Sequence, residues 1–174
     1  AKFARISVGT MGSGTRDIDL GDIPQAHPSA DDLRRNVRDQ ALVAKAWARR
    51  EGPARFTLPL GAPAPALPEA KDFGAKWAFG SQPGSSEVHS GVDYPLALGA
   101  PVASLADGTV VIAEDLFFTG KAVFVDHGDG LISMYFHLSD LKVQAGQDLK
   151  KGETLGLAGS TGRATGPHLH LGVR

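Results

Sequence analysis

Two histidines near the end of the chain stand two residues apart in an alternating run. His168 and His170 are interleaved with Leu169, Leu171 and Val173. This period of two predicts a half-buried strand, in which residues two apart point to the same face. The α-carbons of the two histidines would then lie about 6–7 Å apart. Both imidazoles could act on one bound ion or substrate, so the run predicts a metal or catalytic site.

A histidine and a carboxylate, His89 and Asp93, lie four residues apart with Gly91 between them. In a fully extended strand their α-carbons would be about 13 Å apart, slightly too far to share one zinc ion. A bend at Gly91 would bring them within reach. The chain has no cysteine, so histidine and carboxylate are the expected metal ligands. Together with a late histidine they would supply the three protein ligands of a catalytic zinc site.

The other histidines stand in less informative surroundings. In residues 131–137 the even positions are apolar, so we expect them to face the core. His137 would then stand on the solvent face beside Tyr135, as an unpaired surface histidine. His127 lies in a glycine-flanked turn and is interpreted as a turn residue. His27 precedes a predicted helix and is interpreted as incidental.

The composition is that of an ordinary globular protein. The chain has 174 residues, of which 42% are hydrophobic and 21% charged, and its formal net charge is -1. That charge gives no basic footprint, so we expect no nucleic-acid partner. No apolar run approaches the roughly 18 residues of a membrane helix. Ala1 begins no signal peptide and Arg174 ends the chain within a predicted strand, so we expect an excised piece with a truncated C-terminus.

A surface helix is predicted over residues 28–52. Ser29 followed by Asp32 fits a capping box, and Gly52 is a natural C-terminal stop. Apolar residues recur on one side at spacings of three and four: Leu33, Val37, Ala41, Ala44 and Trp47. The opposite side carries charged residues: Arg35, Asp39, Lys45 and Arg49. We expect the helix to pack on its own chain through Trp47, with partner binding as the alternative.

The remaining segments lie on either side of this helix. Residues 1–27 contain one predicted strand, Phe3 to Val8, and a turn-rich run at 11–14, and are interpreted as the tail of a preceding β segment. Residues 53–72 are rich in proline and alanine and predict an extended connector, because proline excludes helix there. Within it, residues 56–58 are predicted to form a short strand.

Residues 73–174 predict short strands and turns with no helical period. Two hairpins and one further strand are expected: 101–104 with 109–112 around Asp107-Gly108, 122–126 with 131–137 around residues 127–130, and 154–158. The predicted fold class is therefore mainly β: an antiparallel β-sheet domain of barrel or sandwich type, preceded by one surface helix and an extended linker.

Several of these stretches resemble one known family. They are His89-Ser-Gly-Val-Asp93, Ala106-Asp-Gly-Thr-Val110, Met134-Tyr-Phe-His137-Leu138, Val143-x-Ala-Gly-Gln-x-Leu-x-x-Gly152 and Gly159-Ser-Thr-Gly-Arg-Ala-Thr-Gly-Pro-His168-Leu-His170. In this order they resemble the lysostaphin-type zinc endopeptidases that cut peptidoglycan cross-bridges. The similarity runs from about Phe56 to Arg174, and the stretch 61–70 departs from it. Residues 1–52 resemble, more weakly, the region before this domain in Gram-negative cell-wall peptidases.

The resemblance implies a role for each matching residue. His89, Asp93 and His170 would bind zinc, while His137 and His168 would be catalytic, assisting proton transfer and carbonyl polarisation around a zinc-activated water. No glutamate stands close to a ligand as in His-Glu-x-x-His proteases, which also favours a histidine base. Residues 73–174 would be the catalytic domain, acting on peptidoglycan peptide in the periplasm or outside the cell. The expected bond joins D-alanine to meso-diaminopimelate, with a glycine-rich bridge as the alternative.

Other functions remain as alternatives. A non-catalytic relative that binds cell wall or activates an amidase would lack zinc ligands, whereas all five motif positions are filled here. A sugar-transport phosphocarrier would need two facing histidines without a nearby carboxylate, and Asp93 argues against it. The loop 159–166 lacks the Gly-Lys-Ser/Thr ending of a phosphate loop. We expect it to turn the chain before His168 and to line a cleft, where an extended peptide could add to a strand edge.

Overall fold

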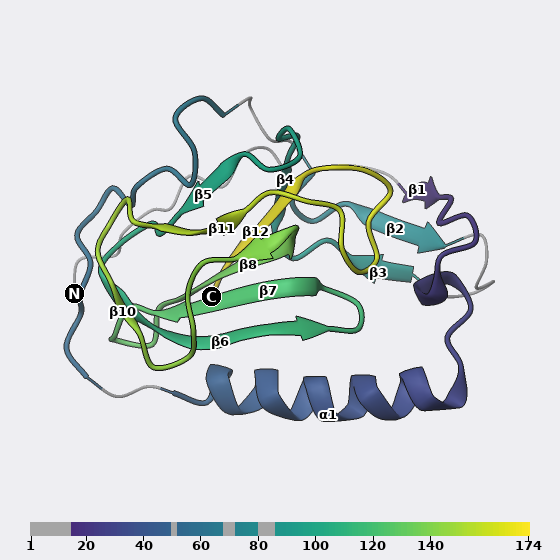
Figure 1. The fold of residues 1–174 in the computed structure, drawn as a ribbon, viewed down its shortest axis with the longest axis horizontal. Coiled ribbons are helices and arrows are strands. Elements are labelled where there is room, and N and C mark those ends of the chain that lie inside the picture. Colours follow the sequence, from purple (N-terminus) through teal and green to yellow (C-terminus); the bar gives the residue numbers. More distant parts are fainter. Residues whose placement is uncertain (1–14, 50–51, 68–71, 80–85) are drawn as a thin grey trace.

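The computed structural model describes residues 15–49, 52–67, 72–79 and 86–174. Within these ranges it contains helix α1 (Ala30–Trp47), the short 3-10 helix η1 (Pro24–Ala26) and three β-sheets. Helix α1 lies along one face of the largest sheet, and a small sheet lies beyond one end of that large sheet (Figure 1). The small sheet has the order β1 (Thr15–Ile18), β2 (Lys76–Phe79), β3 (Ser86–Val88).

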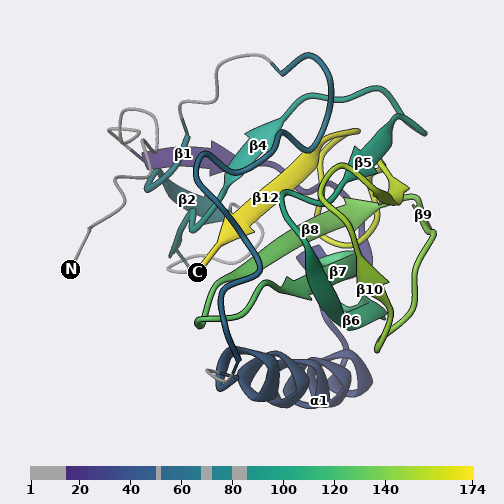
Figure 2. The same cartoon turned by 90° about the vertical axis from the view of Figure 1, so that its left-hand side faces the viewer.

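The largest sheet has six strands, and all neighbours in it run antiparallel. Its order is β10 (Asp148–Leu149), β6 (Gly108–Leu116), β7 (Gly120–Asp126), β8 (Ile132–Leu138), β12 (Leu169–Val173), β4 (Val92–Tyr94). The third sheet has the order β5 (Pro101–Ala103), β11 (Thr154–Leu157), β9 (Asp140–Leu141). Figure 2 shows α1 on one side of β6 and β7, with β5 and β9 away from the helix.

The mainly β class is confirmed. The sheets are antiparallel apart from the β1–β2 pair, and one α-helix precedes the larger sheets. In the described part of the chain each sheet keeps two edge strands, so none closes into a barrel. No helix there combines the length and the apolar character needed to cross a membrane.

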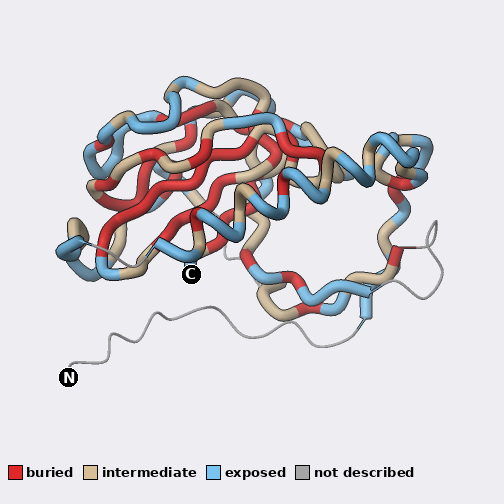
Figure 3. Tube along the Cα trace, turned by 90° about the horizontal axis from the view of Figure 1, so that it is seen from below, coloured by how far each residue is buried: buried red, intermediate tan, exposed pale blue. Residues whose placement is uncertain are grey.

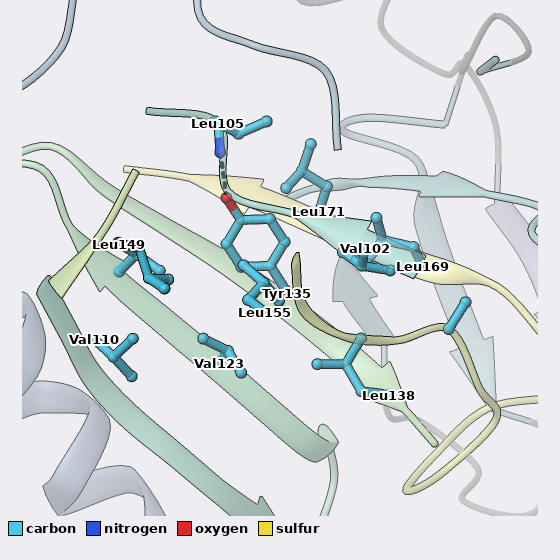
Figure 4. Packing of buried hydrophobic residues seen from close by; sticks show 12 residues of the cluster. Val102, Leu105, Val110, Val123, Tyr135, Leu138, Leu149, Leu155, Leu169 and Leu171 are labelled. Atoms are coloured by element: carbon cyan, nitrogen blue, oxygen red, sulfur yellow. Dashed lines mark hydrogen bonds between the residues drawn. The ribbon is translucent and has the colours of Figure 1, made fainter. Parts of the chain in front are cut away.

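The main core lies between the six-stranded sheet and the β5-β11-β9 sheet (Figure 4). Tyr135 is at its centre, fully buried, and its hydroxyl accepts a hydrogen bond from the Leu105 backbone N–H at 2.9 Å. Fully burying one aliphatic or aromatic side chain of this kind is worth about 1.5–3 kcal/mol. The strands that carry the core are therefore held firmly, and Figure 3 shows their buried residues as continuous red segments.

A second core joins α1 to the other face of the same sheet. It contains Ala46 from the helix with Phe124 and Met134 from the sheet, and Trp47 packs against it. The Trp47 indole N–H points at the Met134 sulfur at 3.4 Å. The expected packing through Trp47 is confirmed, so the helix is fixed to the sheet rather than free for a partner along that side.

The ends of α1 follow two different signals. The capping box is confirmed, since Ser29 and Asp32 exchange side-chain and backbone hydrogen bonds. The helix stops at Trp47, so the predicted end at Gly52 is wrong. After the helix, Arg49 binds Asp126 at 3.0 Å and the Gly52 carbonyl accepts from the Asp129 N–H at 3.1 Å. The first contact is with the last residue of β7 and the second is with the loop that follows it.

The predicted apolar stripe of α1 is largely wrong. Leu33 and Val37 are exposed, and Ala41 and Ala44 are exposed as well. Asp39, expected on the solvent side, is buried and accepts the Phe117 backbone N–H at 2.8 Å. That hydrogen bond rotates the helix so that Asp39, Leu42, Val43, Ala46 and Trp47 form its contact face.

Three strand predictions need correction. The hairpin of 101–104 with 109–112 is wrong, because β5 pairs with β11 while β6 pairs with β7 and β10. Residues 56–58 form no strand, and residues 53–67 of the predicted connector contain neither helix nor strand. The Phe3–Val8 strand and the turn at 11–14 lie outside the described residues. The hairpin of β7 with β8 is confirmed, as is a strand at β11.

Candidate metal and catalytic site

Three of the predicted residues converge at one end of the sheet. His89 follows β3, Asp93 lies in β4 and His170 lies in β12. Asp93 and His170 are direct partners in the β4–β12 register, so their side chains project from the same face. His89 Nε2 lies 2.8 Å from His170 Nδ1 and 3.2 Å from Asp93 Oδ1. His170 Nδ1 lies 3.0 Å from Asp93 Oδ1.

A bend at Gly91 produces this convergence, as the sequence predicted. The backbone bends there between His89 and β4. Gly91 is buried, and a Cβ atom added to it would lie 2.5 Å from His170 Nε2 and 2.6 Å from the Leu171 carbonyl oxygen. Only glycine leaves room for the His170 ring at this position. The residue therefore both shortens the His89–Asp93 separation and seats the second histidine.

Residues that sequence analysis missed hold the ligands in place. The Asp72 backbone carbonyl accepts a hydrogen bond from His89 Nδ1 at 3.0 Å. The Asp72 side-chain Oδ1 accepts a second one from the Asp93 backbone N–H at 3.3 Å. The Trp77 ring stacks on His89 with centroids 4.0 Å apart, and Phe136 stacks on His170 at 5.0 Å. Asp72 stood at the end of the predicted connector, and no local pattern in the sequence marks it.

The tautomer of His89 follows from its neighbours. A backbone carbonyl can only accept, so His89 Nδ1 carries the hydrogen and Nε2 presents a lone pair. That lone pair faces Asp93 and His170. Burial raises the pKa of the Asp93 carboxyl, but the adjacent His170 and His89 imidazoles outweigh burial and hold that pKa well below its usual range. An ionised carboxylate therefore faces two imidazole nitrogens.

This donor set fits a zinc ion. The three candidate ligand atoms lie within 4.8 Å of one another. Zinc takes imidazole nitrogen and carboxylate oxygen, and catalytic zinc sites use three protein ligands. Holding a metal-ligating histidine through its other ring nitrogen is the usual arrangement of such sites, and Asp72 does this for His89.

His168 and His137 lie beside these three residues. Their rings are 4.7 Å apart, and His168 Nε2 lies 3.8 Å from Asp93 Oδ1. His168 Nδ1 donates a hydrogen bond to the Gly166 carbonyl, and His137 Nδ1 donates one to the Thr161 carbonyl, each at 2.8 Å. Each Nδ1 therefore carries the hydrogen, which leaves both Nε2 atoms with a lone pair. Two proton acceptors stand next to the candidate metal ligands.

The predicted solvent position of His137 is wrong. From Tyr135 to Leu138 strand β8 advances three residues, while its partner β7 moves two, from Val123 to Lys121. The extra residue is a β-bulge, and His137 takes a φ of 63°, which is uncommon outside glycine. Tyr135 and Leu138 consequently face the main core, whereas His137 is buried and turned toward His168.

Burial also sets the protonation of His137. It lowers the pKa of this histidine to about 3, and the neighbouring His168 adds to the shift. His137 is therefore neutral at pH 7. Burial likewise lowers the pKa of His170, while for His89 the nearby Asp93 carboxylate outweighs burial and raises the pKa.

A pocket of about 180 Å³ opens beside this site. Asp93, His137 and His168 line it together with residues 163–165 of the glycine-rich loop. Gly162 in that loop has a φ of +70°, and a Cβ there would lie 2.3 Å from the Gly120 nitrogen. The loop therefore packs closely against the turn between β6 and β7, as expected of a segment that turns the chain before His168.

The two remaining histidines lie elsewhere. His27 is exposed next to η1. His127 is fully buried and bonded to Asp107 and Ser133, so its interpretation as a simple turn residue is wrong. A Cβ added to Gly128 would lie 2.0 Å from the Pro53 carbonyl oxygen, so this turn lies close against the connector.

Comparison with known families agrees with this geometry. The model of peptidase family M23 matches residues 87–174, which contain His89, Asp93, His137, His168 and His170. This chain belongs to peptidase family M23. The resemblance to lysostaphin-type endopeptidases is thereby confirmed at the level of the family.

Relatives of this M23 chain carry informative names. Peptidoglycan DD-endopeptidase ShyA of Vibrio cholerae is 42% identical over 82 residues, which are 47% of this chain and 19% of that protein. A crystal structure from Pseudomonas aeruginosa assigned to peptidase M23 has a TM-score of 0.70 and 40% identity, over 83% of this chain and 57% of that one. A zinc-containing peptidase from Vibrio cholerae has a TM-score of 0.53 and 30% identity, over 72% of this chain and 36% of that one. The M23 chain spans about a fifth of the length of the curated relatives it matches.

Proposed function

We propose that this chain is a zinc-dependent endopeptidase that hydrolyses peptide cross-links of bacterial peptidoglycan. The convergence of His89 Nε2, Asp93 Oδ1 and His170 Nδ1 carries the proposal. Membership of family M23 and the names of the relatives support it. Residues 73–174 would be the catalytic domain, working in the periplasm or outside the cell.

His89, Asp93 and His170 would hold the zinc ion. When bound, zinc lowers the pKa of a water ligand to about 7 and polarises a carbonyl oxygen. Two neutral imidazoles and one carboxylate leave the centre with a formal charge of +1, which favours both effects. Asp72 and Trp77 would keep His89 in the orientation that presents Nε2.

His137 and His168 would handle the protons of the reaction. Each presents an Nε2 lone pair that can accept a proton from the attacking water. The imidazolium formed in this way can stabilise the negative oxygen of the tetrahedral intermediate or pass its proton to the leaving amine. His137 begins neutral because burial keeps its pKa near 3, so it starts as an acceptor.

The bond between D-alanine and meso-diaminopimelate is the proposed target. The name DD-endopeptidase given to the relatives from Vibrio cholerae supports it. Positioning the scissile carbonyl within about 3–3.5 Å of the nucleophile decides which bond is cut. The groups that flank the bond, and the pocket that receives them, therefore set the preference.

The test is digestion of purified cross-linked muropeptide dimers and, separately, of pentaglycine by the zinc-loaded chain. Asp93→Asn serves as the control, since it keeps the side-chain shape and removes the charge. We expect mass spectrometry to find monomers from the dimers and intact pentaglycine. The reverse pattern would exclude the D-alanine cross-link but leave a zinc peptidase. Failure to cut either substrate with zinc bound would favour a non-catalytic relative.

A further inference from the structure

The N-terminal segment forms one wall of the pocket beside the catalytic centre. Asp93, His137 and His168 line the pocket on the side of the large sheet. Arg16 and Ile18 of β1 line the same pocket, together with Leu20, Trp77 and Phe79. A substrate that reaches the histidines through this pocket therefore meets side chains from before helix α1.

This wall is part of the fold. Strand β1 pairs with β2 in parallel, with Arg16 beside Trp77 and Ile18 beside Phe79. The chain then continues through Leu20 to η1, and Leu20, Ala26 and Phe79 form a small buried cluster. Because β2 also supplies the Trp77 ring that stacks on His89, the wall and the candidate metal site share one support.

Two arginines line the pocket, and they differ in what they bind. Arg163 forms two hydrogen bonds with the Glu87 carboxylate, and its guanidinium lies 4.2 Å from the centroid of the Phe79 ring. Its charge is thereby neutralised and its position fixed. Arg16 is exposed and makes no hydrogen bond or ion pair with any residue in the described ranges. Among the described residues, Arg16 is thus the arginine of the pocket whose guanidinium has no protein partner and can bind a ligand.

Besides the Asp72 and Asp93 carboxylates and the two histidines, the described lining of the pocket combines apolar side chains with the Arg16 guanidinium. Ile18, Leu20 and Phe79 suit an aliphatic chain, and the Arg16 guanidinium suits a carboxylate, which it can bind through two parallel hydrogen bonds. In a D-alanyl-meso-diaminopimelate cross-link, the carbon that bears the scissile nitrogen also bears a free carboxylate and an aliphatic chain. A glycine bridge has neither group at that place.

We infer that Arg16 is a specificity-determining residue that binds the substrate carboxylate next to the scissile bond. The inference rests on the proposed function and gives the N-terminal segment a role in substrate choice. Arg16 contributes to binding and not to the chemical step, so its loss acts mainly on KM.

The experiment compares two muropeptide dimers, one with the free diaminopimelate carboxylate and one with that carboxylate amidated. Steady-state constants are measured for the zinc-loaded 174-residue chain, for Arg16→Gln and for the control Lys76→Gln. Lys76 is an exposed cation on the neighbouring strand β2 and does not line the pocket. All three proteins should melt together, because Arg16 has no partner in the described part of the fold.

We expect Arg16→Gln to raise KM for the free-acid dimer about 10- to 100-fold with kcat little changed. On the amidated dimer it should match the wild type, and Lys76→Gln should match the wild type on both. Equal KM values for wild type and Arg16→Gln on the free-acid dimer would overturn the inference while leaving the proposed function intact. So would an equal effect of Lys76→Gln. If the zinc-loaded wild type cuts neither dimer, the proposed function fails and the inference fails with it.

Discussion

Buried histidines lie at both ends of the β7–β8 hairpin: His127 at the loop end, and His89, His137 and His170 at the other. The two ends differ in the partners of these side chains. At the loop end, His127 Nδ1 donates to the Asp107 carbonyl at 2.8 Å, and Nε2 accepts from the Ser133 hydroxyl at 2.7 Å. Ser133 in turn lies 3.0 Å from the Tyr135 hydroxyl. Every polar group in this chain of contacts has a protein partner.

At the other end of the hairpin, imidazole nitrogens face one another and a carboxylate. His89 Nε2 and His170 Nδ1 converge on Asp93, while His137 and His168 direct unprotonated nitrogens into the pocket. His89, His137 and His170 are buried, as His127 is, so burial of the ring does not distinguish the two ends. The difference is in the partners: the His127 contacts are complete within the protein, whereas the other group has a place for a cation.

Removing a ligand should separate the two groups most sharply. We expect Asp93→Ala and His170→Ala to weaken zinc binding by more than about 100-fold and to abolish cleavage, because a two-ligand site rarely holds catalytic zinc. His127→Ala should keep zinc. Competition with a chromophoric chelator measures the affinities, and zinc loss in His127→Ala would erase the distinction.

Within the candidate site, the proposed ligands and the proposed proton acceptors should be distinguished next. His168→Ala and His137→Ala are expected to keep zinc and to lose about 10²–10⁴-fold in activity. Zinc content and muropeptide cleavage should be measured on the same preparations. Loss of the metal from His168→Ala would show that the roles of the two late histidines are reversed.

A smaller effect is expected at Gly91, which touches the His170 ring. Gly91→Ala places a methyl group 2.5 Å from His170 Nε2 and should weaken zinc binding about 10- to 100-fold by displacing the ring. Gly166→Ala is the matched control, since a Cβ there meets no atom within 4 Å. Equal zinc affinity in the two variants would mean that the ring moves without cost.

The smallest effect concerns acid and His127. Burial lowers the pKa of His127 below 6.5, so below that pH the unfolded chain binds the proton that the folded chain excludes. The stability that this gives is complete above pH 6.5 and is lost as the pH falls. His127→Gln should lower the free energy of unfolding at pH 7.5 by about 1–3 kcal/mol. Between pH 7.5 and pH 5 the variant should lose less of this free energy than the wild type does.

Urea unfolding of the wild type and of His127→Gln measures these free energies. Both proteins are unfolded in the presence of a chelator, so that bound zinc does not contribute to the stability of either. An identical loss of stability between pH 7.5 and pH 5 in the wild type and in His127→Gln would contradict the prediction.

Sequence patterns predicted the structural features that depend on neighbouring residues. The alternation around His168 and His170 corresponds to strand β12, and the His89-to-Asp93 spacing with its central glycine gave the bend. The capping box at Ser29 is present as well. Each of these depends on residues within a few positions of one another, so the sequence alone contains the necessary information.

Features that depend on distant contacts escaped prediction. The family resemblance implied a place for His137 in the site, whereas the alternation of residues 131–137 put it on the solvent face. The bulge that turns it toward the site arises from pairing with β7, and nothing in residues 131–137 marks it. Asp39 faces inward because it caps the Phe117 N–H, which reverses the face expected from apolar residues. Asp72 supports His89 across 17 positions of sequence.

Zinc-edge anomalous diffraction from a crystal of the zinc-loaded chain tests the central claim most directly. The account predicts one strong anomalous peak between His89 Nε2, Asp93 Oδ1 and His170 Nδ1, with His137 and His168 outside bonding distance. A peak bonded to His168 in place of His170, or zinc bound only at other residues, would contradict it.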